Sequence, residues 1–292
     1  MKRLSLLFAL ITLFALSGCE NPAKSRLYTE EGSKQLLRYS DYQKAEETLT
    51  KAIRYDKHNF EAYYYRGCAK VNALDYQGAA EEVKSSWPEM AVSKFTETPL
   101  EAWIAFGVVL VLGLVLLAAA KSSGNRETKV RAYGLLAISL SFVLSCICLY
   151  KMPDGGSVTA ASMLPLLLFS AMYGVGPGFL AGFIYGVLQA LQGGIAGLSA
   201  GMLLLDFLLP FAAVGLAGLA KELPESWGLY PSIVAAALAR ILFHTMSGVQ
   251  FYEYGTLASF EYNITYLGPD ALICILLAFI IAKPVMRLMR RR

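Results

Sequence analysis

The longest uncharged stretch of the sequence determines the class of protein. No Asp, Glu, Lys or Arg occurs from Gly155 to Leu205, and Asp206 is the one charged residue between Asp154 and Lys221. A soluble domain cannot bury so much consecutive apolar chain, whereas a helical membrane domain requires it. Hydrophobic residues make up 56% of the chain and charged residues 16%, which excludes a disordered protein and disfavours an ordinary soluble enzyme. We therefore expect an all-α, polytopic membrane domain.

Basic and Gly/Pro-rich loops divide the apolar sequence into spans. We expect one extra transmembrane helix at 101–120, followed by a six-helix domain over 129–292. Its six spans are predicted at 133–150, 160–174, 176–193, 197–220, 229–251 and 265–283. The basic loop 121–131 and the basic C-terminal tail should both be cytoplasmic. This places the protein in a bacterial cytoplasmic membrane, with residues 20–98 outside the cytoplasm and the C-terminus inside.

The first nineteen residues have the pattern of a targeting segment. Lys2 and Arg3 precede an apolar run from Leu4 to Leu16, as in a secretory signal. The segment Leu16–Cys19 resembles a bacterial lipobox, which implies a signal peptide over 1–19 and lipidation of Cys19. An uncleaved anchor is the alternative. Under either interpretation the chain after Cys19 begins outside the membrane.

A short motif recurs in the polar segment that follows. The sequence DYQKA at Asp41–Ala45 returns as DYQGA at Asp75–Ala79, an offset of 34 residues that matches the tetratricopeptide period. We therefore expect a tetratricopeptide-like helical module over 20–98. So short an array buries little apolar surface, since three repeats are usually needed for stability. An interaction module for an unidentified protein partner and a spacer without a fixed partner both remain possible.

One acidic residue inside a span is the sharpest functional signal. A carboxylate within a membrane helix costs about 2.5–3.5 kcal/mol on insertion scales, so Asp206 should face a cavity, a partner or a substrate. An ion pair with Arg240 is the structural alternative, and the two roles are compatible. Arg240 and His244 are four residues apart and share one helix face, which Gly248 continues.

The residues after this face favour an organic cation as ligand. Aromatic and acidic residues follow it in the sequence: Phe251, Tyr252, Glu253, Tyr254, Glu261 and Asp270. We expect the acidic ones around the mouth of the site. Aromatic faces beside carboxylates suit a flat, positively charged ring, although tyrosines also gather at membrane interfaces without binding a ligand.

Several other functions are disfavoured by missing motifs. Five cysteines without a CxxC pair and two histidines make a metal site improbable. No P-loop and no nucleophile–base motif occurs, so we expect neither an ATPase nor another enzyme, and no cofactor. The net charge of +4 carries no separate basic patch that would bind nucleic acid.

Separated motifs in the second half resemble one membrane family. They are Lys151–Thr159 with Ser162–Pro165, Tyr173–Gln189, Leu205–Phe207 with Phe211–Leu219, Phe243–Gly248, and Tyr262–Asp270. Together, over about residues 130–292, they resemble the thiamine-specific S component of energy-coupling-factor transporters. The resemblance implies a six-helix protein that binds thiamine from outside. It also implies docking onto a transmembrane T protein with two ATPase subunits, which supply ATP-driven uptake.

The resemblance also implies roles for individual residues. The implied ligand-binding residues are Asp206, Phe207, Arg240, His244, Gly248, Tyr252, Tyr262 and Asn263. The loop Lys151–Thr159 would lie over the site as a lid, with Pro153, Gly155, Gly156 and Ser157 in it. A small-residue face on the first family helix, with Ala137 and Ser141, would dock the partner subunit.

Two departures from the family pattern keep alternatives open. The family often has Glu-Tyr where this chain has Asp206–Phe207, and it usually offers a Trp between the positions of His244 and Asn263, where this chain has none. A membrane-anchored repeat scaffold without transport activity is therefore one alternative. The same fold binding another ring-bearing vitamin is a second.

Overall fold

The computed structural model describes residues 21–37, 39–57, 59–152, 156–195, 197–224, 227–252 and 254–291. The predicted lipidation site Cys19, the lid residues Pro153 and Gly155, and Glu253 lie outside the described residues. The chain divides into two compact units, Met1–Ala91 and Val92–Arg292.

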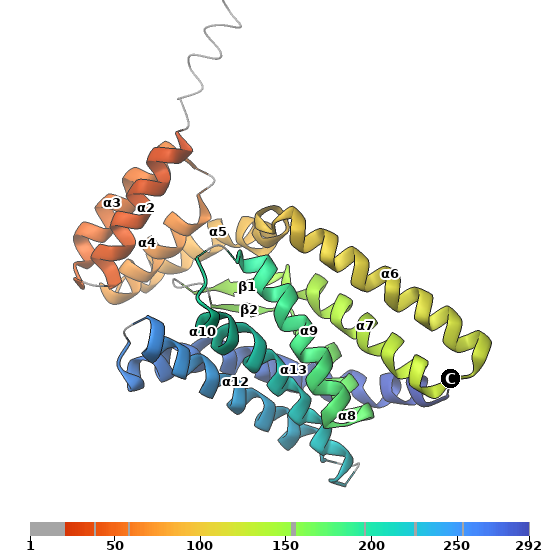
Figure 1. Ribbon diagram of the computed structural model, residues 1–292. Helices are drawn as coiled ribbons and strands as arrows, with labels where there is room; N and C mark the ends of the chain where they lie inside the picture. The colour runs from red at the N-terminus through yellow and green to blue at the C-terminus, as the bar shows by residue number, and fades with distance from the viewer. Residues whose placement is uncertain are drawn as a thin grey trace, which may run out of the picture. The chain divides into compact units, whose positions relative to one another are not determined.

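The first unit is built from helices whose starts follow from capping residues. They are α2 (Pro22–Leu37), α3 (Tyr42–Tyr55), α4 (Phe60–Asn72) and α5 (Tyr76–Glu97), of which the last turns belong to the second unit. Asp41 and Asn59 accept hydrogen bonds from the first turns of α3 and α4, as N-caps do. Leu49 and small residues such as Ala45 and Ala52 are fully buried. Figure 1 shows α2, α3 and α4 side by side. The tetratricopeptide assignment stays a prediction.

The second unit contains the apolar helices. They are α6 (Leu100–Ser123), α7 (Arg126–Ser145), α8 (Leu164–Tyr173), α9 (Val175–Gly193), α12 (Leu229–Phe251) and α13 (Thr256–Arg291). Between α9 and α12 the chain stays helical in four short segments: α10 (Ala200–Met202), the π-helix η1 (Leu203–Leu208), α11 (Leu209–Ala212) and the 3₁₀-helix η2 (Ala213–Lys221).

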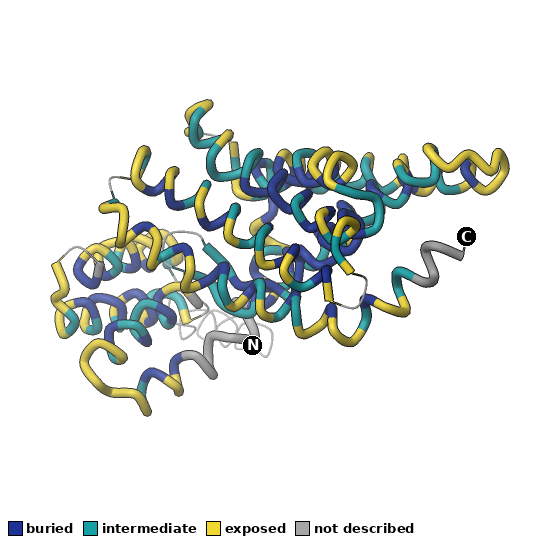
Figure 2. Tube along the Cα trace, turned by 90° about the horizontal axis from the view of Figure 1, so that it is seen from below, coloured by how far each residue is buried: buried dark blue, intermediate teal, exposed yellow. Residues whose placement is uncertain are grey.

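The helix lengths confirm a multi-pass membrane protein. Among the described residues, five helical stretches are long and apolar enough to cross a bilayer: Leu100–Ser123, Val175–Gly193, Ala200–Lys221, Leu229–Phe251 and Thr256–Met286. The helix α8 is apolar but shorter. Figure 2 shows buried residues where helices of the unit face one another. Large apolar side chains such as Val111 on α6 and Phe279 on α13 are exposed, which suits contact with lipid.

A small hairpin departs from the all-α prediction. The predicted span 133–150 ends early, because α7 stops at Ser145 and Cys148–Lys151 forms strand β1. It pairs antiparallel with β2 (Ser157–Thr159). Strand pairing satisfies the backbone of the segment that carries the predicted lid, and Val158 and Thr159 are β-branched residues that favour it. The described part of the predicted lid therefore belongs to a β-hairpin.

The glycines of the family-like motifs allow helices to pack closely. A Cβ on Gly215 of η2 would lie 2.7 Å from Cα of Phe179 on α9. A Cβ on Gly182 of α9 would lie 2.9 Å from the carbonyl carbon of Phe211. Real side chains do not approach backbone so closely, so these positions require glycine. Packing at this distance fixes α9 against the irregular helix that carries Asp206.

Candidate functional site: a polar cavity in the helical unit

A cavity of about 550 Å³ lies within the second unit. Its wall is formed by the end of α5, the β1–β2 hairpin, α9, η1, α12 and α13. This volume is in the range of small-molecule pockets. Seven of the eight ligand-binding residues that the resemblance implied lie in η1, α12 and α13, and the eighth, Tyr252, directly follows α12. All eight line the cavity: Asp206, Phe207, Arg240, His244, Gly248, Tyr252, Tyr262 and Asn263.

Asp206 lies in the π-helical segment η1, a type of helix that is frequent at functional sites. Its Oδ2 accepts a hydrogen bond of 3.2 Å from the Tyr252 hydroxyl, and its Oδ1 lies 3.6 Å from Nδ1 of His244. His244 lies in α12, and Tyr252 directly follows the end of this helix. The carboxylate thus borders the cavity and is oriented by two polar side chains.

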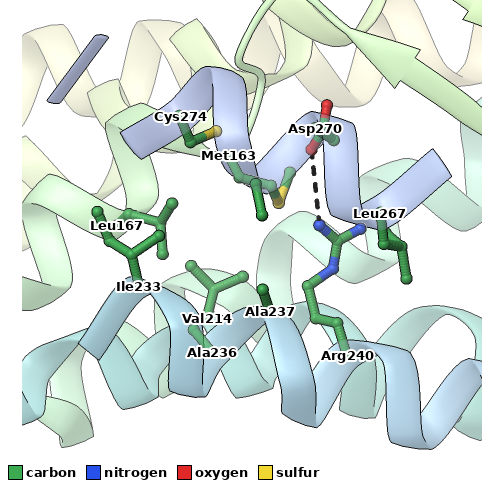
Figure 3. A pocket seen from close by; sticks show the side chains of 11 residues that line it. Met163, Leu167, Val214, Ile233, Ala236, Ala237, Arg240, Leu267, Asp270 and Cys274 are labelled. Carbon is green, nitrogen blue, oxygen red and sulfur yellow. Dashed lines mark ion pairs between the residues drawn. The ribbon is translucent and has the colours of Figure 1, made fainter. Parts of the chain in front are cut away.

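Arg240 pairs with a different carboxylate from the one considered in the sequence analysis. Its Nη1 lies 4.0 Å from Oδ2 of Asp270, and the guanidinium lies 4.9 Å from the centre of the Phe211 ring. Figure 3 shows Arg240 reaching from α12 toward Asp270 on α13. A void of about 20 Å³ beside the pair has room for about one water molecule and not for a ligand. The ion pair between Arg240 and Asp206 is therefore not formed.

Asp270 is an organising residue of the wall, and its expected place at the mouth was wrong. It is 4% exposed. Its Oδ1 accepts hydrogen bonds from the backbone N–H of Thr159, at 3.0 Å, and from the Thr159 hydroxyl, at 2.8 Å. The Asp270 carboxylate therefore connects α13 to Arg240 on α12 and to Thr159 on the hairpin. These partners offset the cost of burying its charge.

The described part of the predicted lid contacts tyrosines of α13. The backbone N–H of Gly156 donates to the Tyr262 hydroxyl at 3.1 Å. A Cβ on Gly156 would lie 2.8 Å from the Tyr266 ring, so a larger residue would not fit between hairpin and helix. Tyr262 also stacks on Tyr254, with ring centres 6.2 Å apart. Gly156 and Ser157 border the cavity, and their role as a lid stays a prediction.

Two of the predicted ligand-binding residues, Asn263 and Gly248, contact other residues of the chain. Nδ2 of Asn263 donates to the Ser259 carbonyl at 2.8 Å, and its Oδ1 accepts from the Tyr266 hydroxyl at 3.0 Å. Gly248 lets α13 approach α12 closely, because a Cβ there would lie 3.1 Å from Cβ of Ser259. Both residues shape the wall of the cavity.

The docking prediction is wrong for Ser141. Its side chain is fully buried inside the chain, and its carbonyl accepts a hydrogen bond from the Tyr185 hydroxyl. Ala137 is half-buried and packs against the apolar core. The small residues of this helix serve packing within the unit, where α6 lies along α7 (Figure 1).

Several polar residues of the wall were not predicted from the sequence. Gln189 and Gln192 of α9 are three residues apart in an apolar span, and this spacing could have identified a polar face. Nε2 of Gln189 donates to Ser145 at 3.1 Å, and Nε2 of Gln192 donates to Thr98 at 3.3 Å. Lys94 also lines the cavity. No sequence signal assigned it there, because it precedes the membrane helices.

The part of the chain that forms most of the cavity is similar to known proteins. Residues 132–290 match the family described as Thiamine transporter protein (Thia_YuaJ). The Thiamine transporter ThiT of Bacillus subtilis (strain 168) is 31% identical over 158 residues, which cover 48% of this chain and 82% of that protein. The matched segment contains every cavity-lining residue except Lys94, Glu97 and Thr98.

Proposed function

Because the chain belongs to the thiamine transporter protein family, we propose that its second unit binds thiamine and serves in the uptake of this vitamin. The observation that carries the proposal is the position of Asp206. It is a carboxylate in an otherwise apolar helical stretch, and it borders a cavity of about 550 Å³. Membrane proteins retain such a charge where it has a function.

The charges of the wall fit a cationic ligand. The Arg240 guanidinium lies beside the Asp270 carboxylate, so its positive charge is offset within the wall. Asp206 has a histidine and a tyrosine as its described partners, and neither brings a permanent positive charge. The Asp206 carboxylate is therefore available as counter-charge for the thiazolium ring of thiamine or as hydrogen-bond acceptor for its aminopyrimidine.

Aromatic side chains supply the flat surfaces that such a ligand needs. Phe207 follows Asp206 in η1, and Tyr252 and Tyr254 line the same cavity. Aromatic faces attract cations and stack on planar rings. We assign Phe207 and Tyr252 to ring contacts, and His244 to the orientation of the Asp206 carboxylate.

Transport by this chain requires an energy source from other subunits. We propose that a transmembrane T protein and two ATPase subunits of the energy-coupling-factor type supply it, since the sequence has no P-loop. Thiamine would enter from outside the cytoplasmic membrane, under the β1–β2 hairpin as lid, with the C-terminus in the cytoplasm.

The N-terminal part has a separate proposed role. We propose that residues 1–19 direct export, that Cys19 carries a lipid, and that the helices up to Ala91 form a tetratricopeptide-like module that binds a protein partner outside the membrane. The capped helices and small buried residues of this unit support the proposal.

Calorimetric titration of the purified full chain in detergent tests thiamine binding. We expect saturable binding with a dissociation constant of micromolar or below. Riboflavin and pyridoxine, two other ring-bearing vitamins, should not compete. Absence of saturable thiamine binding overturns the proposal, and tighter binding of another vitamin reassigns the ligand. A variant without residues 20–91 should still bind thiamine, whereas a pure scaffold would have no binding to retain.

A further inference from the structure

The last turns of α5, which belong to the second unit, contact both strands of the β1–β2 hairpin. Nζ of Lys94 donates a hydrogen bond of 2.7 Å to the Ser157 hydroxyl on β2. Nζ of Lys151 on β1 donates to Oε2 of Glu97 at 3.2 Å. We refer to these two contacts together as the α5 latch. One helix end is therefore bonded to both strands of the segment that carries the predicted lid.

The end of α5 is itself attached to the apolar helices of the unit. Thr98, directly after α5, accepts a hydrogen bond of 3.3 Å from Nε2 of Gln192 on α9. The Phe95 ring stacks on Trp103 of α6, with ring centres 6.1 Å apart. Trp103 in turn meets the fully buried Phe142 edge-on at 5.5 Å. The hairpin is therefore bonded to a helix end that packing with α6 and α9 holds in place.

The latch joins two parts of the chain that differ in their relation to the family. Lys151 and Ser157 lie in the segment that matches the family, whereas Lys94 and Glu97 precede its first matched residue, 132. All four residues nevertheless line the cavity. The latch is therefore a contact between the family-matched segment and the preceding part of this chain.

The two contacts of the latch should differ in strength. Lys94 and Ser157 are both half-buried, and a hydrogen bond from a charged donor is stronger than a neutral one. The Glu97 side chain is 45% exposed, and water and salt weaken an exposed ion pair. Lys94 should therefore contribute more than Glu97 to the position of the hairpin.

We propose that the α5 latch keeps the hairpin over the cavity and slows both entry and release of the ligand, with Lys94 and Glu97 as positioning residues. The inference rests on the proposed thiamine function and on the hairpin as lid. The latch joins two parts of the protein and uses no group of the ligand. It therefore favours the closed hairpin equally in the free and in the occupied protein. Both rates should fall by the same factor, and the affinity should stay the same.

Release kinetics and equilibrium affinity of the full chain in detergent test the latch. Bound radiolabelled thiamine is chased with excess unlabelled thiamine to time its release, and calorimetric titration gives the dissociation constant. In Lys94→Met, release should be about tenfold faster, while the dissociation constant changes by less than about twofold. Glu97→Gln should speed release by about twofold. Lys121→Met and Glu101→Gln, at exposed residues of α6 that do not line the cavity, are matched controls and should change neither quantity.

A double-mutant cycle tests the hydrogen bond between Lys94 and Ser157. Ser157→Ala removes the hydroxyl and should speed release as Lys94→Met does. The double variant should release thiamine no faster than the faster single variant, because both substitutions remove the same bond. If the two accelerations multiply instead, the residues act separately and the latch is wrong. Ser157→Ala deletes one oxygen atom, so it tests the latch even where Lys94→Met does not fold.

Two further results would overturn the inference. The first is an unchanged rate of release in Ser157→Ala. The second is an increase of the dissociation constant by the same factor as the rate of release, because the substituted residue then acts on the bound ligand and not on the hairpin. Absence of thiamine binding by the wild type would instead overturn the proposed thiamine function.

Discussion

The carboxylate that pairs with Arg240 is Asp270, with 4.0 Å between Nη1 and Oδ2. This ion pair offsets the positive charge of Arg240 within the wall of the cavity. With Arg240 occupied by a residue of α13, the carboxylate of Asp206 has His244 and Tyr252 as described partners. Asp270 thus connects elements of the wall, and the Asp206 carboxylate is the one that we propose for ligand binding.

Asp206→Asn should weaken thiamine binding roughly ten- to a hundredfold. The substitution keeps the shape of the side chain and removes its charge, and a hydrogen bond to a charged group contributes about 1.5–3 kcal/mol. Calorimetric titration of the detergent-solubilised protein measures the effect. Glu261→Gln is the control, because Glu261 is exposed on α13 and does not line the cavity. Unchanged affinity in Asp206→Asn would remove Asp206 from the site.

Asp270→Ala should destabilise the second unit by about 3–5 kcal/mol, because it leaves Arg240 as a buried charge without its ion-pair partner. It also removes the acceptor of two Thr159 hydrogen bonds. Thermal unfolding in detergent should show a lower midpoint temperature. Glu261→Ala should leave the midpoint unchanged.

A double substitution separates the ion pair from the rest of the site. Replacing Arg240 with Met in the Asp270→Ala background should recover part of the lost stability, since the uncompensated charge is gone. If Arg240→Met lowers the stability of the Asp270→Ala variant by as much as it lowers that of the wild type, the two side chains are not coupled.

Gly156→Ala should weaken thiamine binding about tenfold by displacing the hairpin. The added methyl group would lie 2.8 Å from the Tyr266 ring and 3.1 Å from the Tyr262 hydroxyl. Overpacking of this kind costs about 1–3 kcal/mol. Stopped-flow measurement of ligand release should show faster dissociation. Gly255→Ala is the matched control, because a Cβ there meets nothing within 4 Å. Equal affinities in both variants would argue against the hairpin as lid.

Gly215→Ala should lower the unfolding temperature, since its methyl group would meet the backbone of Phe179 on α9. We expect a loss of about 1–3 kcal/mol from overpacking. The control is Gly107→Ala in α6, where a Cβ meets nothing within 4 Å. Alanine there should leave the midpoint unchanged or raise it, because alanine favours a helix more than glycine does. A Gly215→Ala midpoint equal to that of the control would contradict the close packing of α9 and η2.

The sequence by itself determined the membrane class and most of the helices. Long charge-free segments have few alternatives in lipid, where each backbone group needs an internal partner. The spans predicted at 176–193 and 229–251 agree with α9 and α12 within one residue at each end. The sequence also predicted Asp206 and His244 as site residues, because polar residues are rare in apolar membrane helices. Both line the cavity.

Tertiary structure alone decided which polar residues meet. The pairing of Arg240 with Asp270, the hairpin after Ser145, the burial of Ser141 and the place of Lys94 depend on how helices far apart in the sequence pack. Spacing along one helix fixes only which residues share a face. Close packing between helices, such as that of glycines against a neighbouring backbone, decides which helix faces meet. Local sequence patterns do not predict this pairing of faces.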